Sequence, residues 1–365
     1  MKKVMPDYNN CIVNLSNSIR KEFGLKTHHS SLQEVDLLFK KKYKNVILFV
    51  FDGMGSDILK NFSKKMFLNE YKVKDITSIL PSTTVAATTS IQTGLFPREH
   101  AWIGCDLYIK DIDEIITMYK NKVRKNGEIL NYNVGMKYFP YKTIVEEINE
   151  STKYHAVDFF PFGKNKYNSF SELKKMIINQ SNKYKKNFIY AYYNNPDSLL
   201  HHNDVNSLIV KNEIKKINDF VKDLSKVMHN ALIIVTADHG HIKSDDFCLD
   251  DYPDINKLVF EELSIEPRFT SFKVKKGKNN AFEQKFNQYF GNDFLLFKHD
   301  DILKNDILGL GDNNRYIDSM IGDYVAIGIT NKYFRDNNCI SKYLSVHSGA
   351  TDNEMLVPLI LIEKK

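Results

Sequence analysis

Three aspartates and three histidines stand at positions where they could bind divalent metal ions. Each aspartate comes at or shortly after the end of an apolar run of strand length, namely the runs 45–51, 187–193 and 231–236. The six residues are Asp52, Asp197, His201, Asp238, His239 and His347. Mixed carboxylate and imidazole ligation suits Zn²⁺, with Mn²⁺ as another option. Six such side chains are too many for one tetrahedral site with an open position, and they match two metals with three protein ligands each.

Hydroxyl-bearing residues are concentrated in the segment 79–94, ILPSTTVAATTSIQTG. Pro81 and Ser82 are typical of the start of a helix, and Gly94 is typical of its end. A threonine at the start of this helix would lie beside backbone N–H groups that can bind a phosphate. Its hydroxyl is a poor nucleophile at its ordinary pKa, but coordination to a metal ion can activate it.

The strands that carry the aspartates predict the architecture. Their apolarity is continuous rather than alternating, which indicates strands buried on both faces, as in a parallel sheet. Helical patterns at 169–184 and 207–228 lie between runs of this kind, and a fourth run covers 357–362. The chain is thus predicted to be an α/β protein with a largely parallel central sheet flanked by helices on both faces. Because ligands bind beyond the carboxyl ends of such strands, the three aspartates would converge there, and cations would offset their repulsion.

The length of 365 residues suggests two domains, or one large α/β domain with insertions. The segment 246–345 is rich in Asp, Lys and Asn and interrupts the alternation of strands and helices. Within it we expect strands at 268–274 and 324–329 and a helix at 280–289. We interpret this segment as a small inserted α+β subdomain, so that the catalytic α/β domain comprises residues 1–245 and 346–365.

Composition and charge narrow the class of protein. The 51 basic and 45 acidic residues give a net charge of +6, which is mild, so we expect a small anionic substrate and no nucleic-acid polymer. The cysteines form no CxxC pair and no disulfide framework, and they are interpreted as free thiols of a reducing compartment; they are Cys11, Cys105, Cys248 and Cys339. No apolar run is long enough to cross a bilayer, and no secretory leader is evident. A cytoplasmic protein without a membrane association is therefore expected; the oligomeric state stays open.

Five blocks of sequence occur in the order of one known family. They are Phe51-Asp52-Gly53, the block Pro81-Ser82-Thr83-Thr84 closing at Thr93-Gly94, the pair Pro196-Asp197 with His201, Thr236-Ala237-Asp238-His239-Gly240, and His347-Ser348-Gly349. On these blocks the chain resembles the type I phosphodiesterase/nucleotide pyrophosphatase family of the alkaline phosphatase superfamily. The resemblance implies an alkaline-phosphatase-like fold and hydrolysis of phosphodiester or pyrophosphate bonds in nucleotide-like substrates.

The same resemblance implies a role for each residue. Asp197, His201 and His347 would hold a first zinc ion. Asp52, Asp238 and His239 would hold a second, toward which Thr84 would bridge as the nucleophile. The family mechanism would be in-line attack by Thr84, formation of a phosphothreonine, and its hydrolysis by a water molecule on the first metal.

Several positions leave alternatives open. Many family members have an Asn three residues after the nucleophile, where this chain has Ala87, so its hydrogen bond would come from Val85 N–H, Thr88 or elsewhere. Thr83 competes with Thr84, and the spacing to Gly94 favours Thr84. His202 competes with His201, and the D-x-x-x-H spacing favours His201. His241 is an outside candidate for a supporting or substrate contact, and His100 is interpreted as structural.

The same site residues could also serve functions other than phosphodiester hydrolysis. A phosphomonoesterase or a phosphonate hydrolase could use the same metal site. A sulfatase is disfavoured because its Cys/Ser-x-Pro-x-Arg signature is absent around Thr84. A metal-dependent binding module without catalysis is disfavoured because all seven family site residues are present.

Overall fold

A computed structural model describes residues 2–260, 263–335 and 343–365. Its main sheet has the strand order β2-β17-β8-β1-β7-β6. The four strands β8, β1, β7 and β6 are parallel, whereas β17 runs antiparallel to both of its neighbours. The strands are β1 (Asn45–Phe51), β2 (Lys72–Thr77), β6 (His155–Phe159), β7 (Asn187–Tyr193), β8 (Ala231–Thr236) and β17 (Leu356–Lys364). The predicted α/β fold with a largely parallel central sheet is confirmed.

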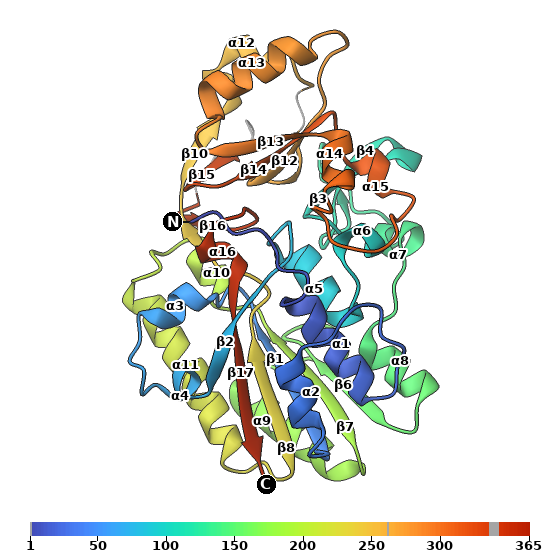
Figure 1. The fold of residues 1–365 in the computed structure, drawn as a ribbon, viewed down its shortest axis with the longest axis vertical. Coiled ribbons are helices and arrows are strands. Elements are labelled where there is room, and N and C mark those ends of the chain that lie inside the picture. Colours follow the sequence, from blue (N-terminus) through green and yellow to red (C-terminus); the bar gives the residue numbers. More distant parts are fainter. Residues whose placement is uncertain (1, 261–262, 336–342) are drawn as a thin grey trace.

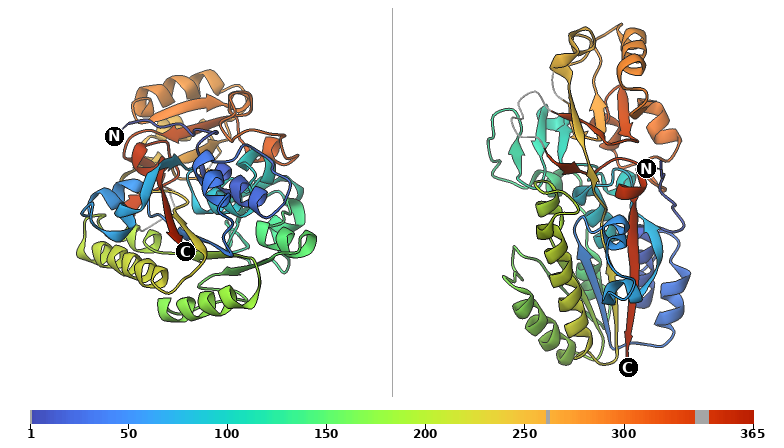
Figure 2. Two further views of the ribbon diagram at one scale, coloured as in Figure 1. Left: turned by 60° about the horizontal axis from the view of Figure 1, so that its bottom comes forward. Right: turned by 90° about the vertical axis from the view of Figure 1, so that its left-hand side faces the viewer.

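Helices cover both faces of this sheet. Figure 2 shows α9 (Phe170–Lys183) and α11 (Leu208–Ser225) on one side and α1 (Ile12–Glu22) and α2 (Gln33–Phe39) on the other. Strands β1 and β8 are buried along their whole length, as continuous apolarity predicted. The patterns predicted as helices at 169–184 and 207–228 are confirmed by α9 and α11. Helix α1 packs beside α5 (Thr84–Thr93), the helix that follows the Pro-Ser-Thr-Thr block, and α2 packs against α1.

A second sheet lies above the main one in Figure 1 and has the order β13-β14-β12-β11-β3-β4-β5. It joins β11 (Ser264–Glu266), β12 (Phe269–Phe272), β13 (Phe294–Lys298) and β14 (Tyr324–Gly328) to β3 (Asp106–Ile109), β4 (Glu114–Thr117) and β5 (Lys122–Val123). The last three strands belong to residues 1–245, the part of the chain that the sequence assigns to the catalytic domain. The division at residues 246 and 345 stays a prediction, but the sheet itself crosses that boundary.

The remaining α-helices and strands of the described residues are mostly short. The helices are α3 (Ser56–Lys60), α4 (Phe67–Glu70), α6 (Pro97–His100), α7 (Val134–Tyr138), α8 (Ile144–Ser151), α10 (Asp197–Leu200), α12 (Pro253–Asn256), α13 (Asn279–Phe290), α14 (His299–Lys304), α15 (Ile317–Met320) and α16 (Asp352–Met355). The strands are β9 (Ile242–Lys243), β10 (Asp245–Cys248), β15 (Lys332–Arg335) and β16 (Ser345–Val346). Among the described helices, none has the length and apolarity needed to cross a bilayer. Cys11 and Cys105 are free thiols, whereas Cys339 lies outside the described residues.

The direction of the strands fixes where the functional residues lie. Strand β17 descends to the C-terminus at the bottom of Figure 1, and β8 runs antiparallel to it. The carboxyl ends of β1, β7 and β8 therefore point toward the second sheet. Asp52, Asp197 and Asp238 follow these ends, so they lie where the two sheets meet.

Candidate metal centre and nucleophile

The hydroxyl of Thr84 points at the acidic strand ends. Thr84 is the first residue of α5, after Thr83 in an extended conformation, and the helix ends at Gly94 with a positive φ of 78°. Thr84 Oγ1 lies 3.2 Å and 3.3 Å from the two carboxylate oxygens of Asp52 and 3.1 Å from His239 Nε2. The neighbouring Thr83 Oγ1 instead donates a hydrogen bond to Glu266 at 2.8 Å. The geometry thus favours Thr84 over Thr83 as the nucleophile.

The predicted ligands gather in two overlapping groups. Ligand atoms of one group lie within 4.8 Å of one another, and its members are Asp197, His201, His241 and His347. A second group with the same spacing contains Asp52, Asp197 and His239. Asp238 joins the second group, because its Oδ2 lies 3.6 Å from His239 Nε2. The structure therefore brings all seven predicted site residues together, and their roles stay predictions.

Backbone carbonyls fix the orientation of three of the predicted ligand histidines. Nδ1 of His201 lies 3.0 Å from the carbonyl oxygen of Ser345. Nδ1 of His239 lies 3.0 Å from that of Gly240, and Nδ1 of His347 lies 3.2 Å from that of Ser82. A carbonyl only accepts hydrogen bonds, so each Nδ1 carries the proton and each Nε2 offers a lone pair. This is the arrangement that metal-binding histidines show in proteins.

Asp238 has a buried oxygen without a hydrogen-bond partner. Its Oδ1 accepts hydrogen bonds from Gly53 N–H (3.1 Å) and His239 N–H (3.0 Å), whereas its Oδ2 is buried and accepts none. Asp52 accepts a hydrogen bond from the hydroxyl of Tyr192. Burial, and next the charge of a neighbouring aspartate, raise the pKa values of Asp52 and Asp238 well above the ordinary range. A divalent cation would satisfy the unpartnered oxygen and offset this repulsion, so the residues fit a metal.

Asp197 has the opposite electrostatic environment. Burial acts to raise the pKa of Asp197, but a hydrogen bond from His241 and the nearby imidazoles together lower it below its ordinary value. Its carboxylate is thus held in the ionised state beside His201 and His347, whose Nε2 atoms lie 3.5 Å and 3.6 Å from its Oδ1. Asp197 can therefore accept a metal ion without first losing a proton.

Comparison with known proteins decides the family. The model of the type I phosphodiesterase/nucleotide pyrophosphatase family matches residues 46–292. The chain belongs to this family. Members of the family are hydrolases, so the predicted enzyme class is confirmed. Six of the seven site residues lie within the matched range, and His347 lies beyond it. No curated protein sequence matches the chain significantly.

Solved structures confirm the alkaline-phosphatase-like fold. Murine ectonucleotide pyrophosphatase/phosphodiesterase 5 superposes with a TM-score of 0.66 at 18% identity, covering 86% of this chain and 87% of the other. Phosphonoacetate hydrolase from Sinorhizobium meliloti 1021, in complex with phosphonoformate, gives 0.64 at 16% identity, with 87% and 90% covered. An inactive form of the murine enzyme, in complex with AMP, gives 0.66 at 17% identity, with 86% and 87% covered. At these identities the matches establish the fold of this family member and no more.

Some residues of the site were missed or underrated from the sequence. His241 was only an outside candidate, yet it lies in the first group; its spacing of two residues from His239 was the available signal. Tyr192 was not singled out, although it is the second-last residue of β7, the strand that leads to Asp197. His202 is exposed. His100 is buried between Ser90 Oγ (3.0 Å) and Trp102 N–H (3.0 Å), and burial lowers its pKa to about 3, which supports the structural interpretation.

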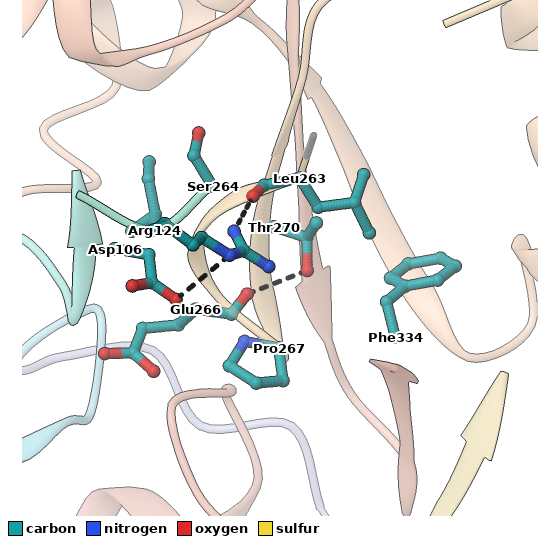
Figure 3. Close-up of a pocket in the computed structure, with 9 residues that line it drawn as sticks. Asp106, Arg124, Leu263, Ser264, Glu266, Pro267, Thr270 and Phe334 are labelled. Atoms are coloured by element: carbon teal, nitrogen blue, oxygen red, sulfur yellow. Dashed lines mark hydrogen bonds and ion pairs between the residues drawn. The ribbon is translucent and has the colours of Figure 1, made fainter. Parts of the chain in front are cut away.

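A small cavity lies at the second sheet, and none of the predicted site residues lines it. Figure 3 shows it between Arg124, which points toward Asp106 and the Leu263 carbonyl, and the main chain of Glu266, which binds Thr270. Its volume of about 60 Å³ is far below what a nucleotide needs. The carboxyl of Glu266 points away to accept hydrogen bonds from Thr83 and from Cys105 N–H (2.7 Å), and burial raises its pKa to about 7. Glu266 therefore ties the second sheet to the start of α5.

Proposed function

We propose that this family member is a two-zinc hydrolase of phosphodiester or pyrophosphate bonds in nucleotide-like substrates, acting through a phosphothreonine at Thr84. The observation that carries the proposal is the position of Thr84 Oγ1, within 3.1–3.3 Å of Asp52 and His239 at the start of α5. A hydroxyl in this place has metal ligands on one side and the backbone N–H groups of a helix start on the other.

The six predicted ligands form two groups, which supports two metal ions. Asp197, His201 and His347 would hold one ion, and Asp52, Asp238 and His239 would hold the other. Bound zinc supplies Lewis-acid stabilisation of the oxygens that gain charge as the ester is cleaved. Mixed carboxylate and imidazole donors suit zinc better than magnesium or calcium, which prefer oxygen ligands alone.

The chain's own residues prepare the attack. Thr84 Oγ1 is oriented toward Asp52, and Tyr192 fixes the second oxygen of that carboxylate. In-line attack forms the bond from Thr84 Oγ1 to phosphorus and breaks the bond to the leaving alcohol or phosphate. Water then attacks the phosphothreonine, which returns Thr84 to its free hydroxyl and releases the phosphate product. Two zinc ions would carry four positive charges and three aspartates three negative ones, so a phosphate ester with one or two negative charges would be attracted to the metals.

Tyr119 is the best-placed substitute for the family asparagine that Ala87 replaces. Its hydroxyl lies 3.0 Å from Thr88 Oγ1, one helical turn after Thr84. Thr88 Oγ1 already donates to the Thr84 carbonyl at 2.7 Å, so the phenol is the donor of the pair. The pKa of Tyr119 is raised, mainly because its phenol oxygen is shielded from water and less by Tyr141, Asp52 and Asp238, so the phenol stays protonated although 58% of the residue as a whole is exposed. A phenol has one proton to donate, so we infer that the Tyr119 O–H turns from Thr88 to a phosphoryl oxygen when a substrate binds.

A phosphomonoesterase or phosphonate hydrolase is the second candidate. The observation that favours it is the loss of the asparagine at position 87, combined with a fold similar to that of phosphonoacetate hydrolase. Both candidates share the metal ligands and Thr84. They differ in whether the site accommodates a second substituent on phosphorus.

A paired assay tests the proposal. We would measure kcat/KM for bis-p-nitrophenyl phosphate, p-nitrophenyl phosphate and phosphonoacetate with the zinc-loaded protein. The proposal expects a clear preference for the diester, followed by activity on AMP-containing pyrophosphates. A preference for the monoester or for phosphonoacetate selects the second candidate.

Two variants separate chemistry from folding. Thr84→Ala should abolish turnover with either class of substrate while it still binds zinc, because the nucleophile alone is removed. Thr83→Ala is the matched control, and it should keep most of the activity. Equal turnover of Thr84→Ala and the wild type would refute the covalent mechanism.

A further inference from the structure

Three histidines surround one oxygen of Asp197. Its Oδ1 lies 2.6 Å from His241 Nε2, whereas the Nε2 atoms of His201 and His347 lie at 3.5 Å and 3.6 Å. The two longer distances suit ligands of one metal, since donors bound at about 2.0–2.1 Å in a tetrahedron lie roughly 3.3–3.4 Å apart. The distance of 2.6 Å is that of a hydrogen bond. His241 is therefore placed as a donor to Asp197 and not as a fellow ligand, although it belongs to the same spatial group.

The other ring nitrogen of His241 has a different partner from those of the ligand histidines. Its Nδ1 lies 2.8 Å from the hydroxyl of Ser345, whereas His201, His239 and His347 each face a carbonyl. A hydroxyl can donate to Nδ1, which leaves the ring proton on Nε2, where Asp197 accepts it. The hydrogen-bond network thus assigns His241 the tautomer opposite to that of the three ligands.

Ser345 supports two histidines at once. Its hydroxyl faces His241, and its carbonyl accepts a hydrogen bond from His201. Ser345 begins β16, which pairs with β9, the strand that follows His241 directly. Gly53 closes the opposite side: a Cβ there would lie 2.9 Å from His241 Cδ2 and 3.0 Å from Asp197 Cβ. His241 and Ser345 are both buried, so the ring has little freedom to turn.

We propose that His241 is a positioning residue, which orients Asp197 for the metal that Asp197 shares with His201 and His347, and that Ser345 orients His241 in turn. This inference rests on the proposed two-metal function. It adds a Ser345–His241–Asp197 chain of hydrogen bonds, which the family's ligand pattern does not contain. Partners of this kind typically change metal affinity by about 10- to 100-fold when they are removed.

Metal affinity tests the proposal without reference to turnover. Zinc would be titrated into the metal-free, full-length protein against a chromophoric chelator, and Co²⁺ spectra would report the coordination at each site. The variants are His241→Leu, which removes the donor, His241→Gln, which keeps an N–H near the position of Nε2, and Ser345→Ala. His229→Leu, at an exposed histidine before β8, is the matched control.

The expected result is a loss of about 10- to 100-fold in affinity at one of two zinc equivalents in His241→Leu. His241→Gln should recover most of that loss with an unchanged Co²⁺ spectrum, and Ser345→Ala should show a smaller loss at the same equivalent. Wild-type affinity in His241→Leu would overturn the proposal. Equal losses in His241→Leu and His241→Gln, with a changed Co²⁺ spectrum, would overturn it in favour of direct ligation.

The same titration separates this inference from the function on which it rests. A wild-type protein that takes up no zinc refutes both. A wild-type protein that binds two zinc ions without cleaving any phosphate ester refutes the proposed function alone, because the affinity differences among the variants still stand. Should His241→Leu fail to fold, His241→Gln and Ser345→Ala keep the ligation and positioning alternatives distinct.

Discussion

The ion pair between Arg268 and Glu354 joins the turn between β11 and β12 of the second sheet to α16, the short helix that follows His347. Both side chains are completely buried, and two hydrogen bonds connect them, Nε to Oε1 at 2.7 Å and Nη2 to Oε2 at 2.8 Å. Glu354 also accepts hydrogen bonds from Gly349 N–H at 2.8 Å and from the Thr351 hydroxyl at 2.6 Å. A change at Glu354 therefore affects the fold and the segment that positions His347.

Glu354→Gln is expected to lower the free energy of unfolding by about 3–5 kcal/mol, because it leaves a buried guanidinium without a counter-charge. Arg268→Met should cost less, since the carboxylate of Glu354 keeps Gly349 and Thr351 as donors. The double variant should be more stable than the sum of the two losses predicts, by about 1–3 kcal/mol, because neither charge is then left alone.

Urea unfolding of the metal-free protein measures these differences without a contribution from zinc. Asp300→Asn is the matched control: Asp300 and Lys304 form an exposed pair, with 71% and 70% of their side chains exposed, for which we expect less than about 1 kcal/mol. A Glu354→Gln variant that loses no more than this control, with an unchanged dependence on urea, would refute the reasoning. Such a result would mean that water reaches the guanidinium.

The remaining predictions concern the site. Tyr119→Phe should lower kcat/KM for the preferred ester by about 10- to 100-fold, because a hydrogen bond to a charged oxygen is lost. Adding Ala87→Asn to this variant should recover activity. Unchanged kinetics in Tyr119→Phe would exclude the phenol as a donor. Zinc affinity at the Asp52–Asp238–His239 group should fall as the pH falls, because the raised pKa values of both aspartates keep protons there that zinc must displace. The same protons stabilise the metal-free protein at low pH and not at high pH, so the rise in Tm on adding zinc should grow with pH; a constant rise would contradict this. A chiral phosphorothioate ester should be hydrolysed with retention at phosphorus, since each of two displacements inverts it, whereas net inversion would exclude the phosphothreonine.

The sequence contained enough to predict the main sheet and the convergence of the ligands. Continuous apolar runs of strand length that stop just before Asp52 and Asp238 are typical of strands buried on both faces, and parallel strands bring their carboxyl ends together. The limits of α5 followed from local rules, because Pro81 and Ser82 are typical of a helix start and Gly94 tolerates the positive φ at which the helix ends. These inferences rest on short-range patterns, which a single sequence displays directly.

The composition of the second sheet could not be predicted in the same way. Strands β3, β4 and β5 lie more than 100 residues before β11, and β3 joins β11 through a single register pair, Asp106 with Ile265. Pairing at that separation depends on side-chain packing that leaves no periodic signal in the sequence. The contribution of Tyr119 to the site depends on this pairing, since Tyr119 lies between β4 and β5.

The role of a histidine at this centre depends on the hydrogen-bond partner of its Nδ1 atom, which the sequence does not show. His239 and His241 have the same side chain, lie two residues apart and face the same metal centre. His239 Nδ1 meets the carbonyl of its own neighbour Gly240, which forces the lone pair onto Nε2 and favours a ligand. His241 Nδ1 meets the hydroxyl of Ser345, 104 residues later, which permits a proton on Nε2 and favours a donor. A Ser345→Ala substitution therefore acts on His241 by removing the hydroxyl that keeps the ring proton on Nε2. The partner of the second ring nitrogen thus says as much about the role of a histidine as the group that its first nitrogen faces.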